Sequence, residues 1–518
     1  MLMLAVSSSP TAAHVGVRKL VAIAAGIAAV GFAGSFAGSW IPSLWGDEAA
    51  SVLSATRPVP SLLAMVLHVD IVHAAYYLGL HMWVLLFGAS PLSVRLPSAL
   101  AAGVCAGTVA WMGGRARSPR FAVAAGLFAA ILPRLTYAGE EARSYSSDAA
   151  LAALLCAIVL EIVLQRTTAR RWWIAYTAVL IVGTYAFLYL ALMTLAVGVF
   201  LALRPATRIH LRRWLFCSLI AAVAALPLLV IAATQTRQIA YLAARNAASP
   251  EAVLVQMWFS APLFALIGWA LIVVAAVGML RDARFPSRSR VGSLDLLALA
   301  WLVIPMGLLV AVNPVLPGYT ARYGTYAAPA AAVLMASGVT RLATIIDGAR
   351  DRTIAGSVLV AVVLTAAVPA WAAQRTPFAK NQSDWNQIAS VIHDDSRPGD
   401  AIVFDESTRP SRRPRLAMDT DPAAFAAVRD VTLSSPYADN RTWHDTTLGI
   451  DAAERLGRFR NVQRIWLVEY RAGARVDSWG EASLRRLGFR LVGSVLDHRS
   501  VIVLYAKAGI MTRAPAAG

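Results

Sequence analysis

Long apolar runs recur between residues 20 and 372, and this feature constrains the fold of the chain most. Each run has roughly the 17–25 residues that a helix needs to cross a ~30 Å hydrocarbon core. With 58% hydrophobic and 15% charged residues, the chain has too little polar surface for a soluble protein of its size. The sequence therefore predicts a polytopic α-helical membrane protein with about eleven transmembrane helices. We place the spans near residues 20–40, 92–113, 120–134, 147–165, 172–185, 187–203, 212–233, 257–280, 293–312, 323–343 and 353–372.

The direction of the spans follows from the arginines. The formal net charge is +18, and much of the arginine lies in short connections between apolar runs, as the positive-inside rule requires, so nucleic-acid binding is not expected. The run Ala74–Gly88 is only about 15 residues long, and we expect it to be a surface helix. The Arg-rich connections then all face the cytoplasm, together with the N-terminus. We expect a multi-pass protein of the inner (plasma) membrane.

The chain changes character near residue 372, where charges become frequent and apolar runs shrink to strand length. We therefore divide it into a transmembrane domain, residues 1–372, and an extracytoplasmic domain, residues 373–518. The second part alternates helical and strand-like segments and predicts a small soluble α/β domain. The three cysteines lie inside apolar runs and show neither a disulfide framework nor metal-ligand spacing.

The first outward loop carries two groups of polar side chains. Asp47 and Glu48 follow the first span, and Asp70 and His73 precede the surface helix. Carboxylates close to hydrocarbon are costly unless they are solvated or paired. One interpretation is a hydrated loop whose acids cap helices, and the other is a functional site.

Two further outward segments carry arginines, against the usual charge bias. The segment YAGEEARSYSSD contains Glu141, Arg143 and Tyr145, and a later segment places Arg322 and Tyr323 at the mouth of a span. These arginines either bind an anionic ligand or extend toward the interface. Acids on one loop and arginines on two others, all on one face, suit acid–base chemistry on a phosphate-bearing lipid substrate.

The order of these motifs resembles the GT-C superfamily of membrane glycosyltransferases over roughly residues 20–345. Within the superfamily the chain resembles bacterial polyprenyl-phosphate-mannose-dependent mannosyltransferases, which are related to protein O-mannosyltransferases and to the lipid A aminoarabinose transferase. The motifs are the acidic pair Asp47-Glu48, the segment with Asp70, His73, Tyr76 and Tyr77, the RLPSAL start at Arg95, the EARSYS segment, the Thr184-Tyr185 turn and the Arg322-Tyr323 pair.

The resemblance implies an outward-facing donor, a sugar on a polyprenyl phosphate, transferred with inversion. Asp47 matches the position of the catalytic base, and Arg143 and Arg322 become candidates for holding the lipid phosphate. Asp70 and His73 would shape the donor or acceptor pocket. The other candidate binding residues are Glu48, Tyr76, Glu141, Tyr145 and Tyr323.

The chain departs from the resembled pattern in two places. It has VHAAYY where relatives often have HPPLYY, and the turn at Thr184 lacks the histidine that relatives often have there. Some relatives bind a divalent metal near the base. Asp47, Glu48 and His73 could serve as ligands, but we expect no cofactor and no metal.

We therefore expect an inverting hexosyltransferase that moves a sugar, most simply mannose, to a glycolipid, polysaccharide or lipoglycan of the cell envelope. Arabinose as the sugar, or a protein as the acceptor, would need no visible change in these motifs. A transporter or flippase would instead show repeated halves and broken spans. A non-catalytic envelope-assembly protein would tolerate changes at Asp47.

Overall fold

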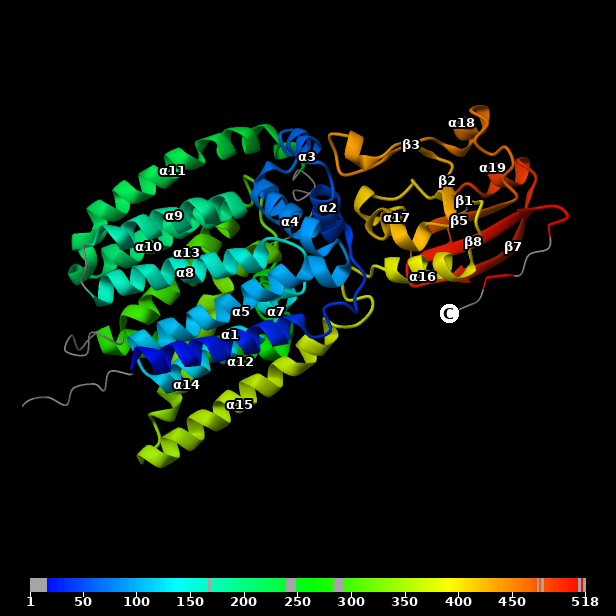
Figure 1. Ribbon diagram of the computed structural model, residues 1–518. Helices are drawn as coiled ribbons and strands as arrows, with labels where there is room; N and C mark the ends of the chain where they lie inside the picture. The colour runs from blue at the N-terminus through cyan, green and yellow to red at the C-terminus, as the bar shows by residue number, and fades with distance from the viewer. Residues whose placement is uncertain are drawn as a thin grey trace, which may run out of the picture.

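The computed structural model describes residues 16–165, 169–238, 248–283, 292–472, 475–476, 479–510 and 514–515. A helical bundle forms one end of the molecule and a mixed α/β domain forms the other (Figure 1). The bundle is built from α1 (Val17–Phe36), α5 (Pro91–Ala116), α6 (Pro119–Ile131), α7 (Pro133–Gly139), α8 (Tyr145–Leu164), α9 (Arg170–Ala186), α10 (Met193–Leu203), α11 (Leu211–Thr234), α12 (Pro262–Ala283), α13 (Gly292–Val312), α14 (Ala328–Ala343) and α15 (Ala349–Ala373).

The described helices confirm the polytopic helical architecture. Seven of them are long and apolar enough to cross a membrane, and eight if α6 and α7, which meet at a 59° bend, are one span. The remaining expected spans form α9, α10 and α14, which are helical but only 17, 11 and 16 residues long. The bend between α6 and α7 was not expected; it falls at Pro133, which cannot donate the helical hydrogen bond.

Four short elements form the segment that the sequence predicts to be the first outward loop: α2 (Gly46–Ala55), α3 (Val59–Val66), η1 (Ile71–His73) and α4 (Ala74–Phe87). They gather at the end of the bundle that faces the α/β domain (Figure 1). The 14 residues of α4 reach about 21 Å, which is less than the ~30 Å of a hydrocarbon core. This length agrees with the surface helix that the sequence predicts.

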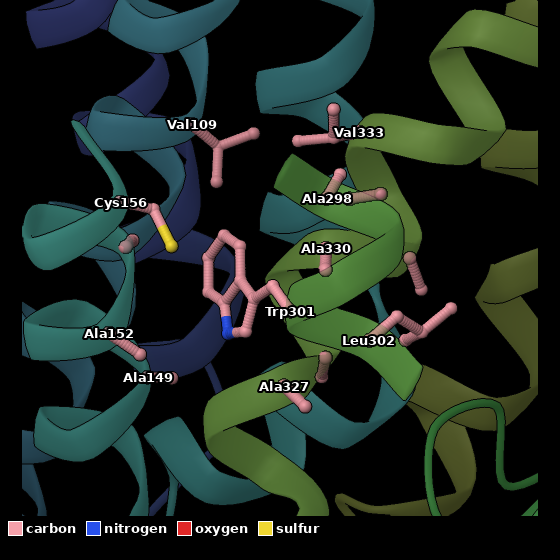
Figure 2. Close-up of a cluster of buried hydrophobic side chains, with 14 of the residues drawn as sticks. Val109, Ala149, Ala152, Cys156, Ala298, Trp301, Leu302, Ala327, Ala330 and Val333 are labelled. Carbon is pink, nitrogen blue, oxygen red and sulfur yellow. The ribbon is translucent and has the colours of Figure 1, made fainter. Parts of the chain in front are cut away.

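Small residues let the bundle helices approach closely. A Cβ on Gly103 of α5 would lie 2.6 Å from the Ala28 carbonyl oxygen of α1. Larger side chains fill the centre, where Trp301 of α13 packs among α5, α8 and α14 beside Val109, Ala152 and Cys156 (Figure 2). The Trp301 indole N–H donates to the Tyr326 carbonyl at 2.8 Å, so the buried polar group is satisfied.

The C-terminal domain contains the sheet and helices that the sequence predicts. The sheet order is β2-β1-β5-β8-β7, in which β1 pairs parallel with β2 and β5, and β8 pairs antiparallel with β5 and β7. The strands are β1 (Asp400–Phe404), β2 (Val428–Asp430), β5 (Arg464–Ala472), β6 (Arg475–Val476), β7 (Phe489–Leu496) and β8 (Ser500–Lys507), with a separate pair β3 (Leu433–Ser435) and β4 (Thr446–Thr447). The helices are α16 (Trp385–Asp395), α17 (Leu416–Thr420), α18 (Ile450–Arg455) and α19 (Glu481–Arg486).

The α/β domain is docked on the first outward loop through a shared hydrophobic cluster. Leu44, Val52 and Leu53, in and next to α2, lie in one buried cluster with Trp385 and Phe404 of the domain. Polar contacts surround this cluster. Arg57 donates to the Asn440 carbonyl at 2.7 Å, and the Thr56 and Tyr437 hydroxyls lie 3.0 Å apart.

Candidate active site

Asp47 lies in the first turn of α2, at the interface with the α/β domain. Trp45 is extended and α2 begins at Gly46, where an added Cβ would lie 2.4 Å from the Ser411 carbonyl oxygen. Only glycine therefore fits at the start of this helix. Two acidic residues, Asp47 and Glu48, follow in the first turn, where the positive end of the helix dipole stabilises negative charge.

Adjacent residues on a helix point in different directions, and Asp47 and Glu48 face different surroundings. The Glu48 carboxylate is fully buried and forms a two-pronged pair with Arg95, at 2.7 Å to Nε and 2.6 Å to Nη2. It also accepts the Ala142 N–H at 2.9 Å. The structure thus places the predicted binding residue Glu48 in a structural ion pair that fixes α2 against α5.

The Asp47 carboxylate faces Arg322, which belongs to the 3₁₀ segment η7 (Ala321–Ala327) before α14. Their ion pair is 2.6 Å long, and the two side chains keep 21% and 23% of their surface exposed. Arg322 also stacks over Trp45 and Tyr323, at 5.6 and 5.8 Å from the ring centres. This pair joins residues 275 positions apart, counted as 322 minus 47, and remains reachable from solvent.

Behind Asp47 lies a buried network that holds the helix start in place. Arg143 donates from Nη1 to the Asp47 carbonyl at 3.3 Å, the Ser51 hydroxyl at 3.4 Å and the Tyr77 hydroxyl at 3.0 Å. The Tyr77 hydroxyl in turn donates to Asp70. Asp70 adopts a left-handed backbone conformation with φ of 63°, which is uncommon outside glycine and typical of constrained sites.

Burial dominates the electrostatics of this network. It raises the pKa of the Asp70 carboxyl, although the neighbouring Arg143 and the Tyr77 hydroxyl lower that pKa. It also lowers the pKa of His73 well below 6.5, and the positive charge of Arg143 lowers it further. His73 is therefore neutral at physiological pH, and it lies 3.9 Å from Asp70.

A cavity of about 620 Å³ opens beside the Asp47–Arg322 pair. Arg322, Arg134, Glu141 and Trp45 supply its polar wall, and the Trp45 indole N–H donates to Glu141 at 3.0 Å. Burial raises the pKa of the Glu141 carboxyl. The other lining residues are Tyr137, Gln256, Ser260, Ala261, Thr320, Ala321, Pro369, Ala370, Ala373, Gln374 and Ala379.

Arg134 reaches the cavity because of the bend between α6 and α7. It is the second residue of α7, and its side chain donates to the Met257 carbonyl at 3.0 Å and to the Gln256 carbonyl. The cavity therefore has two guanidinium groups from distant segments in its lining, together with apolar residues from the end of α15. Such a lining fits an anionic head group on an apolar chain.

The segment that links α15 to the α/β domain contributes Gln374 and Ala379 to the cavity wall. Glu140 is buried between Arg375 and Lys380 of this segment, at 3.3 Å from each. The Lys380 ammonium also lies 3.3 Å from the centre of the Tyr137 ring. These contacts fix the linker against the segment between α7 and α8, next to Gln374 and Ala379 of the cavity wall.

The structure brings most of the predicted residues together around Asp47, in different roles. Glu141 and Arg322 line the cavity, whereas Arg143, predicted as a phosphate ligand, lies in the network behind Asp47. The rings of Tyr145 and Tyr323 lie 6.2 Å apart in an aromatic cluster that also contains His73. Tyr76 packs on the apolar clusters of the first outward loop.

Sequence reasoning missed Trp45, Tyr137, Arg134 and Lys380 as parts of the site. Trp45 directly precedes the acidic pair, and Arg134 directly follows a proline inside an expected span. A proline at that position predicts a break in the helix. Pro133 was therefore the one sequence feature that could have indicated a special position for Arg134. No sequence pattern indicated that Lys380 belongs to the site, because its contact with Glu140 depends on the tertiary fold of the linker.

The suggested metal set does not assemble. Glu48 is occupied by Arg95, and no three His, Cys, Asp or Glu side chains converge as metal ligands in the described part of the chain. The residues around Asp47 therefore do not fit a protein-held divalent cation.

The described part of the chain is a bundle of membrane-type helices with a C-terminal α/β domain, and its fold is similar to that of solved membrane proteins. The solved structures that resemble it include the crystal structure of ArnT from Cupriavidus metallidurans bound to undecaprenyl phosphate, with a TM-score of 0.54 at 15% identity over 95% of this chain and 98% of that chain. ArnT from the same organism in the apo state gives a TM-score of 0.53 at 14% identity, covering 92% and 97%. No family model matches the sequence, and comparison with curated proteins gives no significant match. The likeness shows that the chain shares its overall fold with ArnT, and it confirms the predicted architecture of membrane helices followed by a C-terminal α/β domain.

Proposed function

We propose that this protein is an inverting glycosyltransferase that uses a polyprenyl-phosphate sugar as donor. The observation that carries the proposal is the partly exposed Asp47–Arg322 pair at the edge of a cavity with a second arginine, Arg134, in its wall. The fold is shared with ArnT, which was crystallised with undecaprenyl phosphate. A carboxylate beside an anion-binding cavity is the arrangement that transfer from a lipid phosphate requires.

In the proposed reaction the acceptor hydroxyl attacks the anomeric carbon of the sugar while the bond from that carbon to the phosphate oxygen breaks. The phosphate leaves with the bonding electrons, and the transition state resembles an oxocarbenium ion. Asp47 accepts the proton of the acceptor hydroxyl. Arg322 and Arg134 stabilise the charge that develops on the departing phosphate.

The resting ion pair gives Arg322 a second role. While Arg322 contacts Asp47 at 2.6 Å, the carboxylate has a partner and is not directed at an acceptor. A donor phosphate in the cavity competes for the same guanidinium. Donor binding therefore releases the Asp47 carboxylate for proton transfer.

We further propose that the site faces the outside of the inner membrane, with the N-terminus in the cytoplasm. The support is the charge distribution. Arg115 pairs with Glu161, and Arg117 pairs with Asp295, at the helix ends remote from the α/β domain. The positive-inside rule assigns that end to the cytoplasm, so the α/β domain and Asp47 lie outside.

Mannose is the sugar that we propose on the motif resemblance, and a cell-envelope glycolipid or polysaccharide is the proposed acceptor. The test assays purified wild-type and Asp47→Asn protein with polyprenyl-phosphate mannose and polyprenyl-phosphate arabinose. We expect the variant to lose about 10²–10⁴-fold in kcat, the usual contribution of a general base. The exposed acid Asp451→Asn is the matched control and should keep full activity. Full activity of Asp47→Asn would refute the assignment of the base, and transfer only from the arabinose donor would change the sugar.

A further inference from the structure

The guanidinium group of Arg322 lies over two aromatic rings. Its central carbon is 5.6 Å from the centre of the Trp45 ring and 5.8 Å from the centre of the Tyr323 ring. We call these two rings the aromatic clamp. A guanidinium group is attracted to the face of an aromatic ring, and it is more weakly hydrated than an ammonium group, so it loses little solvation by stacking. The clamp therefore holds Arg322 through contacts that do not involve Asp47.

Each ring of the aromatic clamp is itself held in place. The Trp45 indole N–H donates to the Glu141 carboxyl group at 3.0 Å, in a buried hydrogen bond. The centre of the Tyr323 ring lies 5.4 Å from the ring centres of Phe187 and Tyr189. The two rings are therefore anchored by different segments of the chain.

Glu141 is a firm anchor, because both of its neighbours in the chain are fixed. The Glu140 carboxylate is buried in ion pairs with the linker, and the Ala142 N–H donates to Glu48 at 2.9 Å. Glu141 itself is almost fully buried in the cavity wall. A carboxyl oxygen accepts an N–H both in the ionised and in the protonated state. The anchor of Trp45 thus needs an oxygen acceptor at position 141, and it does not need a charge there.

The proposed reaction separates Arg322 from Asp47, because a donor phosphate competes for the guanidinium group. A long side chain that loses its partner regains rotamer freedom, and ordering it again costs free energy. The clamp contacts persist when the ion pair opens, since Asp47 takes no part in them. Arg322 then remains at the cavity wall, where the phosphate is expected to bind.

We propose that Trp45 and Glu141 are positioning residues, which hold Arg322 at the cavity in the geometry that binds the donor phosphate. Glu141 acts through Trp45, and Trp45 acts through Arg322, so neither residue needs to touch the phosphate. The inference rests on the proposed function, because the ligand is the phosphate group of a polyprenyl donor. It gives the acid of the cavity wall a role that involves no proton transfer.

A double-mutant cycle tests this series of contacts, with the affinity of the full-length protein in detergent for undecaprenyl phosphate as the measurement. Trp45→Leu should weaken binding about tenfold, the loss expected from a desolvated cation–π contact. Arg322→Gln should weaken it at least as much. In Trp45→Leu/Arg322→Gln the loss should equal that of Arg322→Gln alone, because Trp45 acts only through Arg322. Trp83→Leu is the matched control and should bind like the wild type, since the Trp83 indole N–H donates to the Ser93 carbonyl at 3.0 Å and neither residue lines the cavity.

Glu141 offers a second pair of variants. Glu141→Leu removes the acceptor of the Trp45 N–H and should weaken binding about twofold to tenfold. Glu141→Gln keeps an acceptor oxygen and should recover most of the affinity that Glu141→Leu loses. Equal losses in the two Glu141 variants would overturn the positioning role, because a charge or a direct contact with the ligand would then explain them. Losses that multiply in Trp45→Leu/Arg322→Gln would overturn it too, with the fold of each variant checked by thermal unfolding.

The same measurements separate the positioning role from the proposed function. Binding of undecaprenyl phosphate that depends on Trp45 and Glu141 in this way, without sugar transfer from any donor, would refute the glycosyltransferase and leave the positioning role standing. Sugar transfer by a protein whose Trp45 and Arg322 losses multiply would refute the positioning role alone. A wild-type protein that does not bind undecaprenyl phosphate would overturn both.

Discussion

Asp47 and Glu48 show how one peptide bond can separate a reactive group from a structural one. Glu48 has no exposed surface and a two-pronged arginine partner, whereas Asp47 keeps about a fifth of its side-chain surface exposed. Removing one member of a buried ion pair leaves the other charged and unpaired. Conservative changes at these two positions should therefore fail in different ways.

We expect Glu48→Gln to destabilise the protein by about 3–5 kcal/mol, because Arg95 would lose its buried counter-charge. Asp47→Asn should unfold at nearly the wild-type temperature while losing transfer. The measurement is thermal unfolding of both variants in detergent, followed by size-exclusion chromatography. A Glu48→Gln protein as stable as the wild type would contradict the structural role of the pair.

A pH-dependent contribution to stability is expected from Asp419 in α17. Burial, and next the neighbouring Asp445, raise its pKa well above 3.8. A carboxyl whose folded pKa is raised stabilises the fold below its unfolded pKa, and that contribution is lost as pH rises toward the folded pKa. Asp419→Asn imitates the protonated acid. It should raise the melting temperature by a few degrees at pH 8 and by less at pH 4, and an equal gain at both pH values would exclude this explanation.

At the scale of elements, α14 depends on close backbone contact. Nearly all of its residues are buried, and a Cβ on Gly338 would lie 2.1 Å from the Leu271 carbonyl oxygen of α12. Backbone cannot give way as a flexible side chain can, so the two helices would have to separate. This contact lets Ala-rich helices pack without large side chains between them.

Gly338→Ala should therefore lower stability by about 1–3 kcal/mol, the usual effect of overpacking. Gly307→Ala in α13 is the matched control, since nothing lies within 4 Å of its added Cβ, and alanine favours helix more than glycine does. Comparing the melting temperatures of the two variants tests the expectation. A Gly307→Ala protein that is the less stable of the two would contradict it.

The helices and strands could be predicted from the sequence wherever the periodicity and the length of the apolar runs determine the secondary structure. The apolar runs, the short helix at Ala74–Phe87 and the strands around Ile402 and Trp466 follow from local pattern. The bend at Pro133 was missed because the run continues in composition across it. Local pattern also placed Asp47 and Arg322 on the same face, but their contact is tertiary and could only be expected from the motif resemblance.

At the scale of the whole molecule, Arg57 ties the α/β domain to the bundle. It is fully buried, donates to the carbonyls of Asn440 and Thr442, and stacks on Tyr437 at 5.4 Å. Its partners are backbone atoms of one loop of the domain. The side chain thus holds that loop on α2 without a carboxylate partner at this contact.

Arg57→Gln should loosen the 436–445 loop while leaving the helices intact. Hydrogen exchange of that loop should rise by about tenfold, as expected if the opening free energy falls by about 1.4 kcal/mol. Sugar transfer should fall in parallel if the docked domain presents the acceptor. Arg490→Gln, an exposed position on β7 at the opposite edge of the sheet from β2, is the control and should change neither quantity.

The wall that the linker adds to the cavity also sets an order of events during synthesis. Asp47 emerges from the ribosome early, but Gln374 and Ala379 close the cavity and Lys380 anchors the wall to Glu140. The pocket therefore cannot be complete until more than three hundred residues after its proposed base have been translated. A nascent chain that is already inserted in the bilayer contains Asp47 but lacks the linker residues that complete the cavity wall. The proposed chemistry thus begins only after the linker that carries Lys380 has been translated.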